Sequence, residues 1–316
     1  MASGEVRVAV VGTGEIGRGW ASLAVAAGWP VSLYDQDEPR LDHAPTDVCS
    51  RARNLVALHR ADHDTVEAGI RRLHVGRSLL EACREADWII EAIHEDLRAK
   101  QRLFESLESV ATNARAVTSS TSTFRPQDLA AGTYRKDRCF VVHALNPPEL
   151  IPLVEIVPGP ETDRALLEVV KAWLRALGKI AVTIRKAVPG NVAGRIAAAV
   201  WREAIHLVEH GVIDAADLDR AVSLGPALGW AAAGPLLSNH LAAGDRGVSA
   251  FFQHLLHSFE TVWEDLADWK HLDPETQRHI IGTIERAYEG HMAEIRAARD
   301  RRLAAILTGL EDARRR

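Results

Sequence analysis

Three polar side chains in or beside apolar segments could together perform acid–base chemistry. Ser122 lies in the hydroxyl-rich run 118–123, His143 follows two valines, and Glu155 lies inside the apolar stretch Leu153–Val157. An unpaired buried carboxylate is costly, so Glu155 needs a partner, and His143 is the natural one. A histidine oriented by a buried carboxylate can act as a general base near neutral pH. Each residue alone could be a satisfied structural polar group, but their joint position at the carboxyl ends of strands favours a catalytic site.

A glycine-rich sequence near the N-terminus has the spacing of a dinucleotide-binding loop. Gly12, Gly14 and Gly17 form the pattern G-x-G-x-x-G directly after an apolar run. Gly12 would permit the tight turn, Gly14 the approach of a pyrophosphate, and Gly17 the close packing of a helix on a strand. The N–H groups of the next helix, which begins near Glu15 and Ile16, would face the phosphates. The alternative is a tight turn in an α/β protein that binds no nucleotide.

A carboxylate at Asp35 follows the second apolar run and indicates which dinucleotide is bound. It would accept hydrogen bonds from the adenosine ribose hydroxyls and would repel a 2′-phosphate. The neighbouring Gln36 and Asp37 offer no nearby arginine to hold such a phosphate. The sequence therefore predicts NAD as the cofactor, in preference to NADP.

The elements that would position these residues alternate in the first part of the chain. Helix-like stretches such as Ile16–Ala27 and Arg98–Ala111 separate several apolar runs, which are Val6–Val11, Val31–Tyr34, Trp88–Ala92, Ala116–Ser119, Phe140–Ala144, Leu153–Val157 and Ile180–Ile184. This alternation predicts an α/β fold, a Rossmann-type doubly wound sheet. Apolar residues then recur at helical spacing. We therefore expect an NAD-binding domain over residues 1–188 and an all-helical C-terminal domain over residues 189–316.

Composition excludes several other classes of protein. The 316 residues include 38 Lys and Arg against 43 Asp and Glu, a net charge of −5 that argues against a nucleic-acid partner. The 3 cysteines form no close cluster, so we expect neither a disulfide framework nor a metal site. Neither a signal peptide nor a membrane-spanning run is apparent, so we expect a cytoplasmic protein with no membrane partner.

The chain resembles the 3-hydroxyacyl-CoA dehydrogenase family over nearly its whole length. The glycine loop and four further motifs carry the resemblance: Glu95-Asp-Leu-Arg-Ala-Lys100, Ser119-Ser-Thr-Ser122, His143-Ala-Leu-Asn146-Pro147 and Pro152-Leu-Val-Glu155. Within the family it is most similar to the branch that acts on free acids, which includes L-gulonate 3-dehydrogenase (lambda-crystallin) and L-carnitine dehydrogenase. The branch features are Asn146-Pro147-Pro148, Trp201-Arg-Glu-Ala204, Leu207-Val-Glu-His-Gly211 and Gly234-Pro235-Leu236.

The resemblance implies reversible, NAD-dependent oxidation of the secondary alcohol of a 3-hydroxy acid, or a related small substrate, to a ketone. His143 would take the hydroxyl proton, Glu155 would orient His143, and Ser122 would hydrogen-bond the reacting oxygen. Glu95 and Lys100 would lie near the nicotinamide-side ribose of the cofactor. Asn146 would belong to the substrate-binding residues.

Two departures from the family pattern concern catalysis and substrate. The family carries an asparagine directly before Arg195, where this chain has Gly194, and Asn191 lies three residues earlier. Asn191 could replace the catalytic hydrogen bond in part, or it could simply cap the helix. The free-acid branch carries an Arg–aromatic pair where this chain has Gly229 and Trp230. We therefore expect a substrate other than gulonate or carnitine, with Arg195 and Trp230 as candidate contacts and Trp230 lining the substrate cleft.

Several interpretations stay open at this stage. The protein could be an NAD-binding structural or sensor protein with weakened catalysis, or a specialised-metabolism dehydrogenase that acts on a carrier-bound substrate. Arginines between the second strand and Trp88 could form a solvated helix face or hold CoA phosphates; they are Arg51, Arg53, Arg60, Arg71 and Arg72.

The family also implies a homodimer formed through the helical domain. An apolar helical stripe could serve this interface or lie in the internal core; it consists of Leu255, Leu256, Phe259, Val262 and Trp263. Among the tryptophans, Trp20, Trp88 and Trp201 are expected to be scaffold residues.

Overall fold

The computed structural model describes residues 5–315 and confirms a Rossmann-type sheet followed by helices. The chain divides into two compact units, the first ending at Arg195 and the second beginning at Ile196. All residues expected to act in catalysis and cofactor binding lie in the first unit.

The sheet of the first unit is mostly parallel, and its strand order is β3-β2-β1-β4-β5-β6-β7-β8. The strands are β1 Val8–Val11, β2 Val31–Tyr34, β3 Leu73–Val75, β4 Trp88–Glu91, β5 Ala116–Ser119, β6 Cys139–Ala144, β7 Leu153–Val157 and β8 Ile180–Thr183. Every neighbouring pair is parallel except β6 and β7, which are antiparallel. The sequence did not predict β3, because this three-residue edge strand is only partly buried and shows no apolar run.

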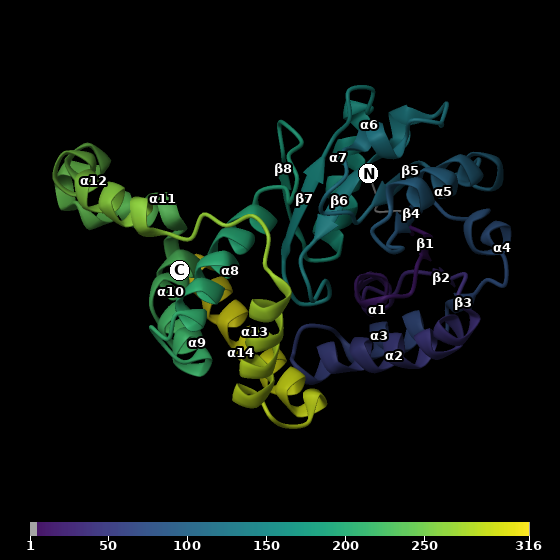
Figure 1. Ribbon diagram of the computed structural model, residues 1–316. Helices are drawn as coiled ribbons and strands as arrows, with labels where there is room; N and C mark the ends of the chain where they lie inside the picture. Colours follow the sequence, from purple (N-terminus) through teal and green to yellow (C-terminus); the bar gives the residue numbers. More distant parts are fainter. Residues whose placement is uncertain (1–4, 316) are drawn as a thin grey trace. The chain divides into compact units, whose positions relative to one another are not determined.

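Helices cover both faces of this sheet (Figure 1). They are α1 Glu15–Ala26, α2 Glu38–Ala57, α3 His63–Ile70, α4 Leu79–Cys83, α5 Leu97–Val110, α6 Pro126–Leu129, the 3-10 helix η1 Lys136–Arg138, and α7 Arg164–Ala176. Successive residues of a strand point to opposite faces of the sheet. Ile89 of β4 accordingly packs in one core cluster with Phe104 of α5. The preceding Trp88 instead meets Trp20 of α1 and Trp173 of α7, with ring centroids 5.8 and 5.7 Å apart.

The second unit is helical, as the sequence predicts. Its helices are α8 Ala193–Glu209, which begins at the end of the first unit, α9 Ala215–Leu224, α10 Pro226–Ala233, α11 Pro235–Ala242, the 3-10 helix η2 Gly244–Arg246, α12 Gly247–Asp265, α13 Pro274–Ala287 and α14 Met292–Arg315. Asp273 caps α13 by accepting hydrogen bonds from the N–H groups of Glu275 and Thr276. Between residues 5 and 315, no helix has both the length and the apolar character needed to cross a membrane.

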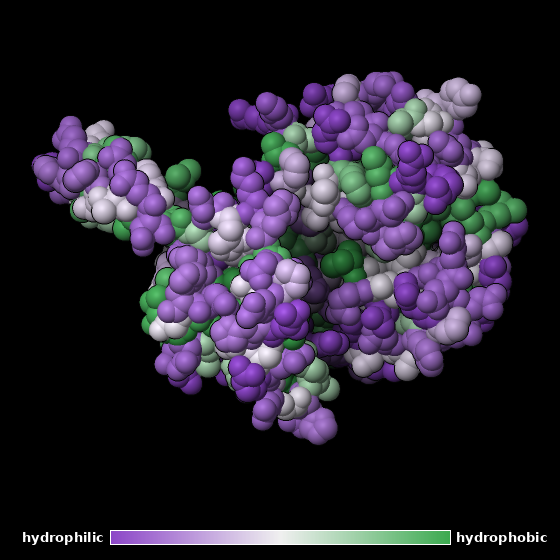
Figure 2. All heavy atoms as spheres, in the orientation of Figure 1, coloured by the Kyte–Doolittle hydropathy of each residue, from purple (hydrophilic) through white to green (hydrophobic). Residues whose placement is uncertain are grey.

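Exposure of the large aromatic residues confirms part of the expectation and corrects the rest. Trp20 and Trp88 are completely buried, as expected of scaffold residues. Trp201 is 60% exposed, so its assignment to the scaffold is wrong. Hydrophilic residues cover most of the molecular face drawn in Figure 2, and hydrophobic areas interrupt them. The α12 stripe contributes to the exposed apolar surface, because Phe259 and Trp263 are 39% and 57% exposed.

Candidate active site

The turn between β1 and α1 has the geometry expected of a dinucleotide-binding loop. Gly12 has a φ of +99°, and a Cβ there would collide with the backbone of Ala92. A Cβ on Gly17 would overlap the Gly12 carbonyl oxygen, so the close packing of α1 on β1 requires glycine. Around Gly14 the space is open, which leaves room for a phosphate to approach the backbone. The three glycines therefore fit the roles predicted for them.

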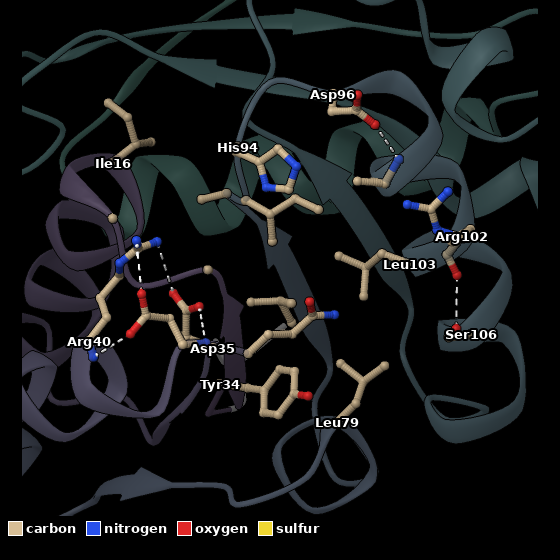
Figure 3. A pocket seen from close by; sticks show the side chains of 18 of the residues that line it. Ile16, Tyr34, Asp35, Arg40, Leu79, His94, Asp96, Arg102, Leu103 and Ser106 are labelled. Atoms are coloured by element: carbon tan, nitrogen blue, oxygen red, sulfur yellow. Dashed lines mark hydrogen bonds and ion pairs between the residues drawn. The ribbon is translucent and has the colours of Figure 1, made fainter.

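A cavity of about 910 Å³ opens at the carboxyl ends of β1, β2 and β4 (Figure 3). Gly12, Gly14, Glu15, Ile16 and Asp35 all line it. Apolar side chains form its far end, where Figure 3 shows Tyr34, Leu79 and Leu103 around one space; these residues also line the cavity. The glycine loop and the Asp35 carboxylate thus share one cavity, which fits an extended dinucleotide.

Asp35 is held in place by the glycine loop and has an arginine nearby. Its carboxylate accepts hydrogen bonds from the Thr13 N–H at 2.7 Å and from the Thr13 hydroxyl at 3.0 Å. Arg40, in the first turn of α2, lies 3.9 Å from Asp35 and 3.2 Å from Asp37. The expectation that no arginine lies near this position is therefore wrong. The chain turns into α2 directly after Asp37, and this turn brings Arg40 back toward the cavity (Figure 3).

A buried charge cluster supports the segment that contains Glu95. Lys100 is 1% exposed and donates to the carboxylate of Glu91 at 2.6 Å, while Glu95 lies 3.3 Å away. The hydroxyl of Ser119 donates to Glu91, and that of Thr121 donates to Glu95. This cluster joins the ends of β4 and β5 to α5. Lys100 is therefore enclosed beneath Glu95, whose side chain remains 40% exposed.

His143 and Glu155 form a close pair across two antiparallel strands. The residues are directly opposite each other in the β6–β7 ladder, and His143 Nδ1 lies 2.9 Å from Glu155 Oε2. The two side chains are 12% and 2% exposed. Glu155 lies in the middle of β7, as its position inside the apolar run Leu153–Val157 predicts, and only its grouping with residues at carboxyl ends of strands does not hold. The reversed direction of β7 brings this mid-strand residue level with His143.

The second carboxylate oxygen of Glu155 holds the start of α8. Glu155 Oε1 accepts hydrogen bonds from the N–H groups of Val192 and Ala193, at 3.0 and 2.9 Å. These N–H groups belong to the end of a helix where no intrahelical acceptor exists. Glu155 is therefore satisfied on both oxygens, once by the histidine and once by the segment that leads into α8. Sequence reasoning did not predict this second contact.

The same segment brings Asn191 beside the Ser122 loop. The Gly190 N–H donates to the Ser122 carbonyl oxygen at 2.7 Å. Asn191 has a φ of +50° and is 5% exposed, and its Nδ2 has no hydrogen-bond partner among residues 5–315. The Gly190–Ser122 hydrogen bond and the contacts of the Glu155 carboxylate thus connect Ser122, His143, Glu155 and Asn191 within the first unit.

The remaining candidate residues, which were predicted to contact the substrate, are exposed to solvent. Asn146 is exposed in the loop after β6, and Arg195 is exposed with Nη1 3.4 Å from the Pro189 carbonyl oxygen. Trp230 lies in α10 of the second unit and is 38% exposed. Their contact with substrate stays a prediction.

Sequence reasoning missed one buried lysine near the loop after His143. Lys179, directly before β8, is 4% exposed and donates to the carbonyl oxygens of Pro148 and Ile151. Burial lowers the pKa of Lys179 to about 8. No local sequence signal marks it, because its partners lie about thirty residues away in the chain.

The loop geometry, the carboxylate after β2 and the paired histidine define an NAD-dependent oxidoreductase with a Rossmann domain. Residues 7–188 match the model for the NAD-binding domain of 3-hydroxyacyl-CoA dehydrogenase, and residues 190–282 match the model for its C-terminal domain. The chain therefore belongs to the 3-hydroxyacyl-CoA dehydrogenase family, and its cofactor is NAD.

Comparisons with individual proteins agree with this assignment. L-Carnitine dehydrogenase of Nocardiopsis dassonvillei is 33% identical, and the match covers 98% of this chain and 92% of that protein. The L-carnitine dehydrogenase of Streptomyces griseus is 34% identical over 95% of this chain and 89% of its own length. The structure of 5-formyl-3-hydroxy-2-methylpyridine 4-carboxylic acid 5-dehydrogenase, an NAD+-dependent dismutase, matches with a TM-score of 0.80 at 26% identity, covering 97% of this chain and 99% of that chain.

Proposed function

We propose that this protein reversibly oxidises the secondary alcohol of a small 3-hydroxy acid, with His143 as the base. The pair formed by His143 Nδ1 and Glu155 Oε2, 2.9 Å apart, carries the proposal. Glu155 accepts a hydrogen bond from Nδ1–H, which keeps that proton on Nδ1 and leaves Nε2 with the lone pair that takes a proton from the substrate. General base help of this kind contributes about 10²–10⁴ in rate.

The other residues of the first unit have matching tasks in this reaction. Bound NAD+ supplies the acceptor for the hydride. Gly14, Glu15 and Ile16 line the part of the cavity for the pyrophosphate, and Asp35 binds the adenosine ribose. Glu95 faces the nicotinamide-side ribose, and the buried Lys100 fixes the position of Glu95. Ser122 donates a hydrogen bond to the reacting oxygen.

Asn191 is a second donor to the reacting oxygen in this proposal. Its Nδ2 is buried without a partner, and a buried donor that lacks an acceptor is destabilising by about 1–3 kcal/mol. A substrate oxygen held beside Ser122 and His143 would satisfy it. The segment that carries Asn191 is fixed by Ser122 and Glu155, which supports placement of its side chain at the reacting carbon.

A substrate without CoA is supported by the partners of three of the five arginines expected as possible ligands for CoA phosphates. Arg53 forms an ion pair with Glu67, and Arg72 donates to the Gly28 carbonyl oxygen. Arg51 contacts three carboxylates. These guanidinium groups are engaged within the protein, which argues against a row of cations for CoA phosphates. Two relatives are named for L-carnitine, which is not a CoA thioester, and this is consistent with the choice. Arg195 and Trp230 are the candidate substrate contacts.

The proposal includes a cytoplasmic homodimer formed through the second unit. Leu255, Phe259, Val262 and Trp263 of α12 are exposed, and the Phe259 and Trp263 rings lie 6.1 Å apart. A monomer rarely exposes a large apolar face, and a second copy of the same helix would cover it. The free thiols of Cys49, Cys83 and Cys139 fit a reducing compartment.

The direct test follows NADH absorbance while the enzyme is offered NAD+ and a panel of 3-hydroxy acids, free and as CoA thioesters. The proposal expects turnover with a free acid, and a much lower kcat/KM with its CoA thioester. Binding of NADH without turnover of any member would instead support an NAD-binding structural or sensor protein. A higher kcat/KM for the CoA thioester than for the free acid would overturn the proposal that the substrate is a free acid.

A further inference from the structure

We infer that Arg51 is a positioning residue that links dinucleotide binding at the start of α1 to the loop that follows β6, the strand of His143. Its guanidinium touches carboxylates of two other segments besides its own helix α2. Nη2 lies 2.8 Å from both oxygens of Glu15, and Nη1 lies 3.1 Å from Glu149. The inference rests on the proposed function, because it assumes that the loop serves His143.

The Glu15 contact reaches the cofactor site. Glu15 is the first residue of α1 and lines the cofactor cavity. A carboxylate beside a pyrophosphate would weaken dinucleotide binding by charge repulsion. Arg51 opposes this repulsion, because its positive charge is bonded to both oxygens of Glu15. Arg18 lies 3.4 Å from the same carboxylate, so Arg51, at 2.8 Å, is the nearer of these two cations, which keep an acidic residue compatible with the phosphates at the helix N-terminus.

The Glu149 contact reaches the loop that follows β6. Glu149 lies three residues after Asn146, and its side chain is only 9% exposed. The neighbouring Pro148 carbonyl accepts from Lys179, so two cations hold this short segment. Helix α1 also abuts it directly, because a Cβ on Gly19 would lie 2.7 Å from the Pro148 ring. A displacement of α1 would consequently displace Pro148 and Glu149, in the loop that follows the strand of His143.

The helix α2 offers a matched control for Arg51. Arg53 is two residues further along and makes a bidentate pair with Glu67, at 2.7 and 3.1 Å. Its side chain is 56% exposed, whereas that of Arg51 is 12% exposed. Arg53 touches neither α1 nor the loop after β6 in the described contacts. Removing the guanidinium group at each position in turn therefore distinguishes a positioning effect of Arg51 from the effect of losing one positive charge on α2.

The experiment compares Arg51→Met, Arg53→Met and Glu149→Gln in the full-length protein. NADH affinity is measured by fluorescence, and kcat is measured with NAD+ and the best 3-hydroxy acid of the panel. Arg51→Met should raise the NADH Kd about tenfold and lower kcat about 10–100-fold, because small displacements at a reacting centre are costly. Glu149→Gln should lower kcat while the NADH Kd stays within about twofold. Arg53→Met should match the unmodified protein in both.

Wild-type NADH affinity and kcat in a folded Arg51→Met would overturn the inference, and so would equal losses in Arg53→Met. If Arg51→Met does not fold, Glu15→Gln and Glu149→Gln are combined. Their effects on kcat should then be non-additive, and simple additivity would overturn the link. Failure of the proposed function is recognised separately, as undiminished turnover in His143→Ala, whereas the effect of Arg51 on NADH affinity does not depend on that result.

Discussion

Glu155 lies directly opposite His143 in the β6–β7 ladder, with Oε2 2.9 Å from His143 Nδ1. Its other oxygen accepts from the N–H groups of Val192 and Ala193. One carboxylate therefore fixes both the orientation of the proposed base and the start of α8. This double use explains how a fully buried acid can be tolerated, since both of its oxygens are satisfied.

Glu155→Gln should lower kcat by about 10²–10⁴ while the NADH Kd changes little. The amide keeps one acceptor oxygen for the Val192 and Ala193 N–H groups, but it removes the negative charge that supports a protonated His143. Steady-state kinetics and NADH fluorescence titration measure the two quantities. A variant with normal kcat would show that the His143–Glu155 pair is only structural.

Asn191→Gly should lower kcat by about 10²–10³ because a donor to the reacting oxygen is lost. Glycine also accepts the φ of +50° found at this position, so the backbone is not strained. The Nδ2 group has no hydrogen-bond partner in the part of the chain that the structure describes, so its removal breaks no hydrogen bond there and relieves the penalty of a buried unpaired donor. The free energy of unfolding should therefore stay the same or rise, by up to about 1–3 kcal/mol. Unchanged kcat together with reduced stability would identify Asn191 as a structural residue.

The double variant Asp35→Ser with Asp37→Ser should accept NADP+. Removing both carboxylates frees Arg40, 3.9 Å from Asp35, to bind the 2′-phosphate. We expect kcat/KM to rise by at least about tenfold for NADP+ and to fall for NAD+, which loses its ribose acceptor. Adding Arg40→Met should remove the gain. If NADP+ use survives that third substitution, Arg40 is not the phosphate ligand.

Stability should depend on the titration of Lys179. Burial lowers the pKa of Lys179 to about 8, below its ordinary value of 10.5, so the unfolded chain binds more protons between these values. The contribution of Lys179 to stability is therefore unfavourable below about pH 8 and becomes less so as the pH rises toward 10.5. Between about pH 7.5 and 9.5, wild type should gain about 2 kcal/mol relative to Lys179→Met. Urea unfolding at both pH values measures this difference, and parallel stabilities of the two proteins would contradict it.

Local patterns in the sequence were sufficient for the elements and motifs that depend on neighbouring residues. The glycine loop, Asp35 and the strand of His143 each carry their own signal, and the structure confirms the loop geometry and the sheet. The pairing of His143 with Glu155 was inferred correctly from burial cost. The reason for it, an antiparallel reversal at β7, depends on the order of distant strands and is not encoded locally.

Features created by distant parts of the chain were not predictable from local patterns. Arg51 and Lys179 look like ordinary surface cations in the sequence, but their partners come from remote segments. Arg40 was overlooked because it faces the cavity only after the chain turns into α2. The exposure of Trp201 likewise depends on how the helices of the second unit pack, which helical spacing alone does not specify.

The most direct test of the account measures turnover and NADH binding in His143→Ala. With the best 3-hydroxy acid of the panel, kcat should fall by about 10²–10⁴, because Nε2 no longer accepts the hydroxyl proton. The NADH Kd should stay within about twofold of wild type, since His143 is not among the residues that line the cofactor cavity. A variant that binds NADH normally and retains full turnover would contradict the assignment of His143 as the base.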